Sequence, residues 1–175
     1  MVAYSYESFL KLVVTRPCVA VFDSSLEQGM STVLQDLGAL SIYTGDAEHN
    51  ETESAPYLVS LNDAGVVNEA ASLYAFQALG SAKMIMALGS TSSVKSQLRR
   101  LSLVSIPDGV VSFRFFDPRV LRSFMNTILP KQLETVFGHV ESYIVESIVS
   151  PILIEYFVDA SCRAVRYRHI SIGKV

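Results

Sequence analysis

Apolar residues recur along this chain at two spacings, and each spacing predicts a different kind of element. Spacings of three and four residues predict helices over residues 4–14, 24–37, 64–79, 93–100 and 118–128, with a shorter helix over 130–138. Runs that are continuously apolar, or that alternate with polar residues, predict strands over 18–22, 40–43, 56–61, 83–88, 101–106, 110–116 and 152–158. Residues 139–149 are also β-type in composition, although they alternate little.

Residues that start or stop helices support several of these boundaries. Pro17 ends the first helix, and Gly38 is placed to end the second. Asp23 or Ser24 is a suitable cap for that second helix. Its predicted apolar face consists of Leu26, Met30, Val33, Leu34 and Leu37.

A hairpin is the clearest local prediction. Pro107-Asp108-Gly109 is a turn sequence between two β-type runs, so it predicts an antiparallel pair. On the second strand, alternation places Phe113 and Phe115 on one face and Arg114 and Phe116 on the other.

Together these elements predict an α/β fold: a mixed sheet with at least one antiparallel hairpin and with helices packed on it, not a pure doubly wound fold. The 175 residues have the length of one ordinary domain, and we expect a single domain over 1–175. The one clear loop is the acidic stretch 44–55. Residues 152–158 are the most hydrophobic stretch near the end; they predict either a core strand, which we favour, or a strand that pairs with a partner.

Composition, hydropathy and cysteine content indicate where in the cell this protein is expected. Half of the residues are hydrophobic and the mean hydropathy is +0.34, which excludes a disordered chain. The best uncharged stretch, 70–82, is too short to span a membrane, so no membrane insertion is expected. The N-terminus lacks the basic opening of a signal peptide, and the chain has two cysteines, of which Cys18 lies in an apolar run. We therefore expect reduced thiols in a cytoplasmic protein, with a Cys18–Cys162 disulfide as the less favoured alternative.

Charge is unevenly distributed although the net charge is only −3. Residues 1–62 are acidic, whereas residues 95–131 and 159–175 are basic. Nucleic acid is not expected as a partner, because the whole chain is acidic and carries no nucleic-acid motif. A polar protein partner agrees better with this balance.

A search for catalytic motifs favours a non-enzymatic protein. The chain has no nucleophile-elbow, phosphate-loop, dinucleotide or C-x-x-C motif. Its histidines, His49, His139 and His169, lack the spacing of metal ligands, and the acidic loop lacks the glycine and closing glutamate of a calcium loop. We expect no catalytic residues, no cofactor and no metal.

One cluster remains: Arg114, Asp117, Arg119 and Arg122 lie within nine residues. Asp117 is the expected N-cap of the following helix, with Pro118 at its first position. Two interpretations compete. The favoured one is an internal network in which Asp117 caps the helix and pairs with Arg114 or Arg119. The other is a basic pocket that takes a partner's carboxylate, because guanidinium groups bind carboxylates in a bidentate fashion.

Several motifs resemble a known pattern in order and spacing. They are Ser54-Ala55-Pro56-Tyr57-Leu58-Val59, Arg99-Arg100-Leu101, Pro107-Asp108-Gly109, Phe113 to Leu121, and Val136-Phe137-Gly138. The pattern is similar to that of the DUF-class effector chaperones of bacterial type VI secretion, also called Tap, TEC or VasW-like adaptors. The family-like core covers about 19–146, and 147–175 is a C-terminal extension. Phe116 stands where the family commonly has tyrosine.

The resemblance implies a cytoplasmic, non-enzymatic bacterial adaptor. Such a protein binds its cognate toxic effector and assists its loading onto the VgrG spike, so the effector and the spike are the expected partners. The residues that match the family motif or are candidates for partner binding are Pro56, Tyr57, Arg114, Phe116, Asp117, Arg119 and Arg122. Two alternatives stay open: a small anionic-ligand-binding domain that uses the arginine cluster, and an immunity-type protein that binds a toxin.

Overall fold

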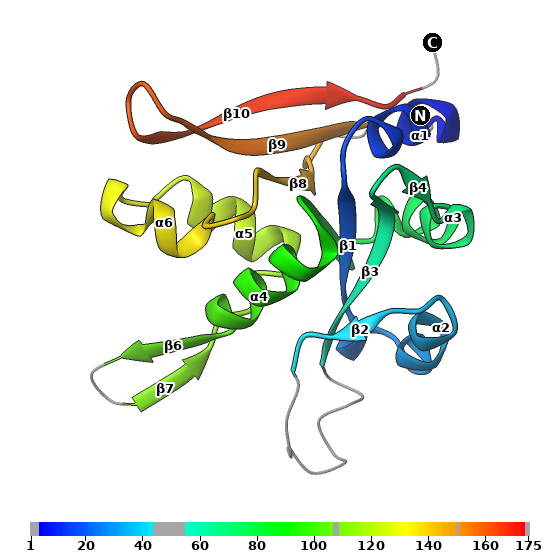
Figure 1. The fold of residues 1–175 in the computed structure, drawn as a ribbon, viewed down its shortest axis with the longest axis horizontal. Helices are drawn as coiled ribbons and strands as arrows, with labels where there is room; N and C mark the ends of the chain where they lie inside the picture. Colours follow the sequence, from blue (N-terminus) through cyan, green and yellow to red (C-terminus); the bar gives the residue numbers. More distant parts are fainter. Residues whose placement is uncertain (1–3, 44–54, 107–108, 150, 174–175) are drawn as a thin grey trace.

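An antiparallel sheet runs through the molecule (Figure 1). The computed structural model describes residues 4–43, 55–106, 109–149 and 151–173. Within them the strand order is β10-β9-β8-β5-β1-β3-β2, β4 pairs with β3, and every pair is antiparallel. The strands are β1 (Cys18–Asp23), β2 (Leu40–Ser41), β3 (Pro56–Asp63), β4 (Val66–Val67), β5 (Met84–Leu88), β8 (Ser142–Glu146), β9 (Ile152–Asp159) and β10 (Ala164–Ser171). A separate hairpin consists of β6 (Leu103–Ile106) and β7 (Gly109–Ser112).

Helices cover both faces of this sheet. They are α1 (Tyr6–Val14), α2 (Met30–Asp36), α3 (Glu69–Ala78), α4 (Thr91–Leu101), α5 (Pro118–Met125) and α6 (Leu133–Val136), with short 3-10 turns η1 (Ser24–Leu26) and η2 (Pro130–Gln132). In Figure 1, α1, α2 and α3 lie to one side of β1 and β3, and α4, α5 and α6 lie to the other. The predicted α/β fold, with helices packed on a sheet and an antiparallel hairpin, is confirmed; in place of a mixed sheet, the described strands form a sheet that is antiparallel throughout.

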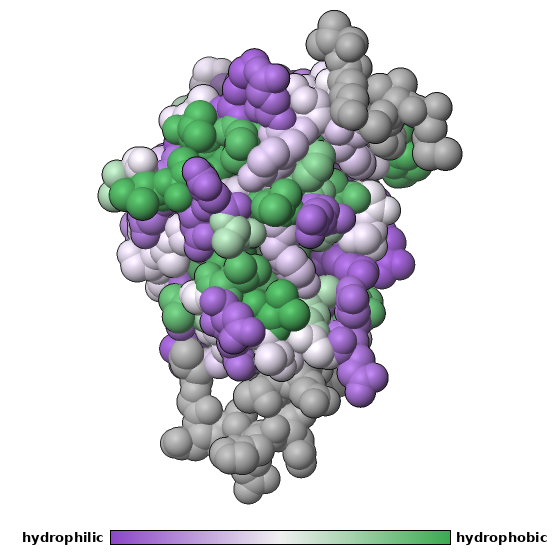
Figure 2. All heavy atoms as spheres, turned by 90° about the vertical axis from the view of Figure 1, so that its right-hand side faces the viewer, coloured by the Kyte–Doolittle hydropathy of each residue, from purple (hydrophilic) through white to green (hydrophobic). Residues whose placement is uncertain are grey.

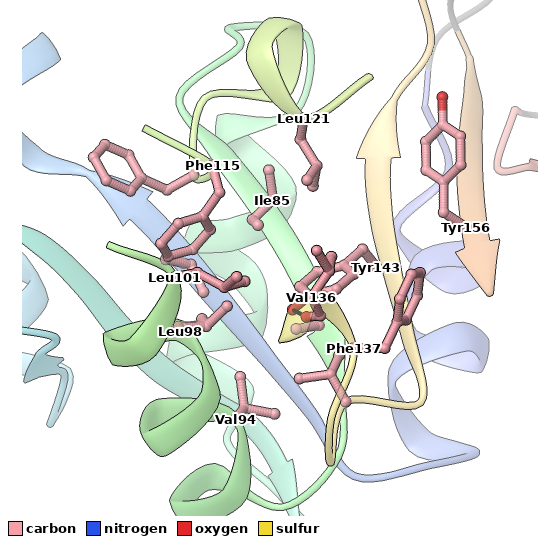
Figure 3. Close-up of a cluster of buried hydrophobic side chains, with 14 of the residues drawn as sticks. Ile85, Val94, Leu98, Leu101, Phe115, Leu121, Val136, Phe137, Tyr143 and Tyr156 are labelled. Atoms are coloured by element: carbon pink, nitrogen blue, oxygen red, sulfur yellow. Dashed lines mark hydrogen bonds between the residues drawn. The ribbon is translucent and has the colours of Figure 1, made fainter. Parts of the chain in front are cut away.

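The central strand β1 shows why the chain is so hydrophobic. Cys18, Ala20 and Phe22 point into the core under α1–α3, whereas Val19 and Val21 point into the core under α4–α6. A strand buried on both faces has no polar positions to alternate with, so it reads as a continuous apolar run. Figure 3 shows the second core, where the side chains of α4 meet Phe115, Tyr143 and their neighbours. The many apolar side chains that raise the mean hydropathy therefore fill two cores, one on each face of the sheet.

The helix predicted over 24–37 is wrong in its first half. Residues 24–26 form η1, and α2 begins only at Met30, after Gly29 with φ +80°. This left-handed residue interrupts the helical path, and Leu26 and Val33 are left exposed instead of joining the apolar face. Gly38 ends α2 with φ +78°, as predicted.

The helix predicted over 64–79 also begins late. Ala64 and Gly65 both have positive φ and form a turn that lets β4 pair back onto β3. The helix α3 then starts after Asn68, whose side chain accepts a hydrogen bond from the Ala71 N–H at 3.0 Å. The helix α4, in contrast, begins at Thr91, two residues earlier than predicted, because the side chain of Ser90 caps it by accepting from the Ser93 N–H.

The predicted hairpin is confirmed, because β6 and β7 pair with Ile106 opposite Gly109; Pro107 and Asp108 lie outside the described residues. The strand prediction for 110–116 is wrong after Ser112. The chain turns there, and Phe115 and Phe116 are both buried although alternation placed them on opposite faces. The polar loop 44–54, with His49, also lies outside the described residues.

The C-terminal extension completes the sheet. Residues 152–158 form the body of β9, which lies between β8 and β10, so the core-strand interpretation is confirmed. The strand β10 was not predicted and comes from the basic tail. Cys18 is buried in β1 and Cys162 is exposed between β9 and β10; both thiols are free, so the alternative of a disulfide is wrong. No described helix has the length and apolar character to cross a membrane.

Candidate functional site

The segment from β7 to α5 makes a sharp corner. The Phe113 N–H donates to the Ser102 carbonyl at 2.9 Å, which ties the end of β7 to the end of α4. The Phe115 N–H then donates to the Phe113 carbonyl at 2.9 Å, and this tight turn redirects the chain. Phe115 and Phe116 pack edge to face with ring centroids 5.4 Å apart. Phe116, at the position where the resemblance implies a tyrosine, is only 3% exposed and is buried in the core that also contains Phe115.

Asp117 caps α5, as predicted. Its Oδ1 accepts hydrogen bonds from the Arg119 N–H at 2.8 Å and from Arg119 Nε at 3.0 Å, and its Oδ2 accepts from an Arg119 guanidinium N–H at 2.7 Å. Burial raises the pKa of Asp117, but the hydrogen bonds and the charge of Arg119 outweigh it, so the pKa lies below its ordinary value. The carboxylate is buried while the side chain of Arg119 is 64% exposed.

Arg114 ties the corner to the end of β1. Its guanidinium pairs with the carboxylate of Asp23, which is 1% exposed, and donates to Ser25 Oγ at 3.2 Å. The same guanidinium lies 5.7 Å from the centroid of the Phe116 ring, within cation–π distance. Asp23 also accepts from the Ser25 N–H at 3.2 Å, so it caps η1 as well. One carboxylate therefore holds together segments 91 residues apart.

Pro56 and Tyr57, the two residues of β3 that match the family motif, are buried and contribute to the packing of the fold. Pro56 is buried and stands opposite Asp23 in the β1–β3 register. Tyr57 is 2% exposed and its hydroxyl accepts a hydrogen bond from Gln35 Nε2 at 3.0 Å, which joins β3 to α2. Neither presents its side chain to solvent.

Arg122 does not contact Asp23 or Asp117 but lies against the end of β8. Its guanidinium donates to the backbone carbonyl of Glu146 at 2.5 Å and so fastens α5 to the end of β8. The Glu146 carboxylate is also buried and accepts from the Gly80 N–H at 2.8 Å. Burial raises the pKa of Glu146 despite these hydrogen bonds and the charge of Arg122.

The structure thus brings together five residues, which we call the β1 corner: Asp23, Arg114, Phe116, Asp117 and Arg119. The charge of Asp23 also acts on Arg119, although the hydrogen bond and charge of Asp117 are the larger causes of its raised pKa. A surface hollow of about 530 Å³ begins at Asp117 and Arg119 and follows the exposed side of α5. The buried carboxylates and the exposed guanidinium groups give the corner an outward-facing layer of N–H donors.

Sequence reasoning missed three buried carboxylates. Asp23 was considered only as a helix cap, and its pairing with Arg114 has no local sequence signal. Glu155, at 1% exposure, accepts from Ser142 Oγ at 2.7 Å, from Arg168 Nε at 2.7 Å and from Arg16 at 3.0 Å. Its position inside the apolar run 152–158 was a usable signal, because an acidic residue in a core strand requires partners. Glu146 is the third.

Metal binding finds no support in the part of the chain that the structure describes, which holds no cluster of three or more His, Cys, Asp or Glu side chains suited to an ion. His139 is exposed after Gly138, and His169 is exposed on β10. What the β1 corner offers is exposed guanidinium N–H donors and positive charge, which are suited to binding a polar group.

Comparison with known proteins places the chain in a family. A search of curated proteins and of solved structures finds no match. The profile described as a domain of unknown function, DUF4123, matches residues 20–135, a span that contains every residue of the β1 corner. Since this match covers most of the chain, the protein belongs to the DUF4123 family.

Proposed function

We propose that this protein is a non-enzymatic adaptor that binds a cognate type VI secretion effector and assists its loading onto the VgrG spike. The observation that carries the proposal is the match to the DUF4123 family over 20–135, together with the junction Phe113 to Leu121 that resembles the effector-chaperone pattern. The expected setting is the bacterial cytoplasm, where an effector is held before secretion.

The β1 corner has properties that suit protein recognition. Its backbone is held by the cap of α5 and by the Arg114–Asp23 pair, so its exposed groups are ordered before a partner arrives. Arg119 uses its Nε and one further nitrogen on Asp117, and a guanidinium carries five N–H donors in all. The remaining donors are available to a carboxylate or carbonyl of the partner.

The face made by α1–α3 is a weaker candidate. Several of its large apolar side chains are exposed: Val14, Val33, Val66 and Leu73. Figure 2 shows, however, that green apolar groups on this face are separated by purple hydrophilic ones. Scattered apolar residues are normal on a protein surface, whereas a binding patch is continuous. We therefore assign the polar contact with the effector to the corner.

Co-expression with toxin-like proteins encoded next to this gene tests the proposal. We expect a complex with one of them that co-elutes in size-exclusion chromatography at moderate salt. Arg119→Ala removes the exposed guanidinium but keeps the backbone N–H that Asp117 caps, so we expect weaker co-elution with the thermal transition retained. Arg100→Ala, an exposed arginine in the last turn of α4, is the matched control.

Three results of this experiment would contradict part or all of the proposal. If no neighbour co-elutes, the adaptor proposal is wrong. If a complex forms and Arg119→Ala behaves like Arg100→Ala, the function stands and the assignment to the corner is wrong. If the bound protein is a toxin and cells that produce this chain survive it without any effect on secretion, the immunity-type alternative replaces loading.

The anionic-ligand alternative has less support. Each of the three arginines already faces an acceptor of this chain: Asp23, Asp117 or the Glu146 carbonyl. Only the donors that these contacts leave over, such as those of the exposed Arg119, remain for a small carboxylate or phosphate. A saturable, salt-sensitive thermal shift with phosphate would nevertheless favour it.

A further inference from the structure

The last strand of the sheet has one side that no described strand covers. Over its eight residues β10 pairs with β9, and it ends the sheet order. The nearest other pairing is the bridge between Tyr4 and Gly173, which lies beyond the C-terminal end of the strand. An edge of this length carries a row of backbone groups suited to another strand.

The register shows which residues face this edge. In β9 the Ile152 carbonyl accepts from the Ser147 N–H at 2.9 Å, on the β8 side. Because backbone groups alternate sides along a strand, Leu153, Glu155 and Phe157 then face β10. Their partners in β10 are Ile170, Arg168 and Arg166. The backbone groups at the free edge therefore belong to the intervening residues: Val165, Tyr167, His169 and Ser171.

Side chains divide the same strand into two faces. On one face Arg166 and Arg168 are 60% and 59% exposed, while the carboxylate that Arg168 contacts, Glu155, is 1% exposed. Arg166 Nε lies 3.7 Å from a carboxylate oxygen of Asp159, which is 33% exposed, so solvent on this side meets more guanidinium than carboxylate surface. On the other face Tyr167 lies between Tyr156 and His169, with ring centroids 6.2 Å and 5.6 Å away. This is an aromatic surface, and Tyr167 is 61% exposed.

A second copy of this chain is a poor occupant of the edge. If two β10 edges paired antiparallel, the edge-facing odd-numbered residues would stand opposite odd-numbered ones. In the register centred on Tyr167, Arg166 and Arg168 would then stand opposite arginines of the other copy. Like charges directly opposite one another destabilise a sheet. The arginines that disfavour a copy favour a strand with carboxylates at those positions.

We propose that the free edge of β10 binds an extended acidic polypeptide segment by strand addition. The segment carries Asp or Glu at alternate positions, beside Arg166 and Arg168, and apolar residues between them, beside Val165 and Tyr167. Main-chain hydrogen bonds to Tyr167 and His169 supply affinity, and the two faces supply specificity. The proposal is independent of the adaptor function, because it concerns a different surface from the β1 corner.

A fluorescent peptide of eight residues, alternating Glu and Val and as long as β10, is the probe. A peptide of the same composition with its four glutamates contiguous is the control, and binding to the full chain is followed by fluorescence anisotropy. We expect the alternating peptide to bind about tenfold more tightly than the control.

Two variants locate the site. His169→Pro removes one edge-facing N–H and leaves the bonds to β9 in place, so we expect roughly tenfold weaker binding with an unchanged thermal transition. Arg166→Glu reverses one charge on the face that meets the carboxylates, and we expect weaker binding and a smaller dependence on salt. Arg100→Glu on α4 is the matched control and should leave binding unchanged.

Three results overturn the proposal. Equal binding of the two peptides shows attraction without strand geometry. Binding that neither His169→Pro nor Arg166→Glu weakens places the peptide elsewhere. Concentration-dependent dimerisation of the free chain that His169→Pro abolishes makes a second copy the occupant. If His169→Pro does not fold, the comparison of Arg166→Glu with Arg100→Glu decides.

Discussion

The pair of Arg114 and Asp23 gives a quantitative test of how the β1 corner is built. Asp23 is buried at 1% exposure, whereas the Arg114 side chain is 48% exposed. The two partners therefore respond differently to loss of the other. Arg114→Gln leaves a buried carboxylate whose remaining donors are the N–H and hydroxyl of Ser25. Asp23→Asn leaves a guanidinium that water reaches.

These surroundings set the magnitudes. Loss of one partner from a fully buried ion pair costs roughly 3–5 kcal/mol. The two donors of Ser25 and the partial exposure of Arg114 reduce this, so we expect Arg114→Gln to lower the free energy of unfolding by about 2 kcal/mol. For Asp23→Asn we expect about 1 kcal/mol, because the amide oxygen still accepts from Ser25. The double variant should cost less than the sum, with a coupling of roughly 1 kcal/mol.

Urea unfolding of the four proteins, followed by circular dichroism, measures the cycle. An order in which Asp23→Asn is clearly the costlier change would refute the burial argument. A coupling energy indistinguishable from zero would show that the ion pair does not hold the corner to β1, and the pre-ordering assumed for recognition would then fail as well.

Helix capping, backbone conformation and burial set three further expected outcomes. Asp117→Ala should lower the free energy of unfolding by about 1 kcal/mol, because α5 loses its cap. The pKa of Asp117 in the folded protein lies below its ordinary value of 3.8, so the stabilisation is complete above pH 3.8 and is lost as the pH falls through the folded pKa. Melting curves of both proteins at stepwise lower pH measure this loss. Gly138→Ala should cost roughly 1–2 kcal/mol in urea unfolding, because φ is +48° and a Cβ would overlap the buried side chain of Gln97. Burial raises the pKa of Cys18 to about 12, so a thiol reagent should label only Cys162 until the protein unfolds.

Much of the fold was readable because local chemistry and tertiary structure agree. Pro17, Gly38, Asp117 and Pro118 mark the same boundaries in the sequence and in the structure. Gly29 shows where this agreement fails: the apolar spacing of 24–37 continues across it, but the backbone takes a left-handed turn that periodicity does not report. The strand β10 was missed for the opposite reason, because an edge strand exposed on both faces has no apolar pattern.

The candidate site was readable only in part. The contact of Asp117 with Arg119 spans two residues and follows from capping rules. The contact of Arg114 with Asp23 depends on the sheet register and on the corner after β7, neither of which a single sequence specifies. Phe116 illustrates the difficulty: strand alternation placed it on the opposite face from Phe115, but β7 ends at Ser112 and both rings are buried in one core.

The two proposed surfaces follow from one property of the fold. An antiparallel sheet often leaves one face to solvent, and that face is then available to a partner. Here α1–α3 and α4–α6 cover both faces of the central strands, so among the described residues the sheet is open to a partner at the ends of strands and along its edges. The β1 corner is such an end, with side-chain donors over buried carboxylates, and β10 is such an edge, with backbone groups between two arginines. A partner held at both would be fixed by directional polar contacts, while the apolar residues that dominate the composition stay within the two cores.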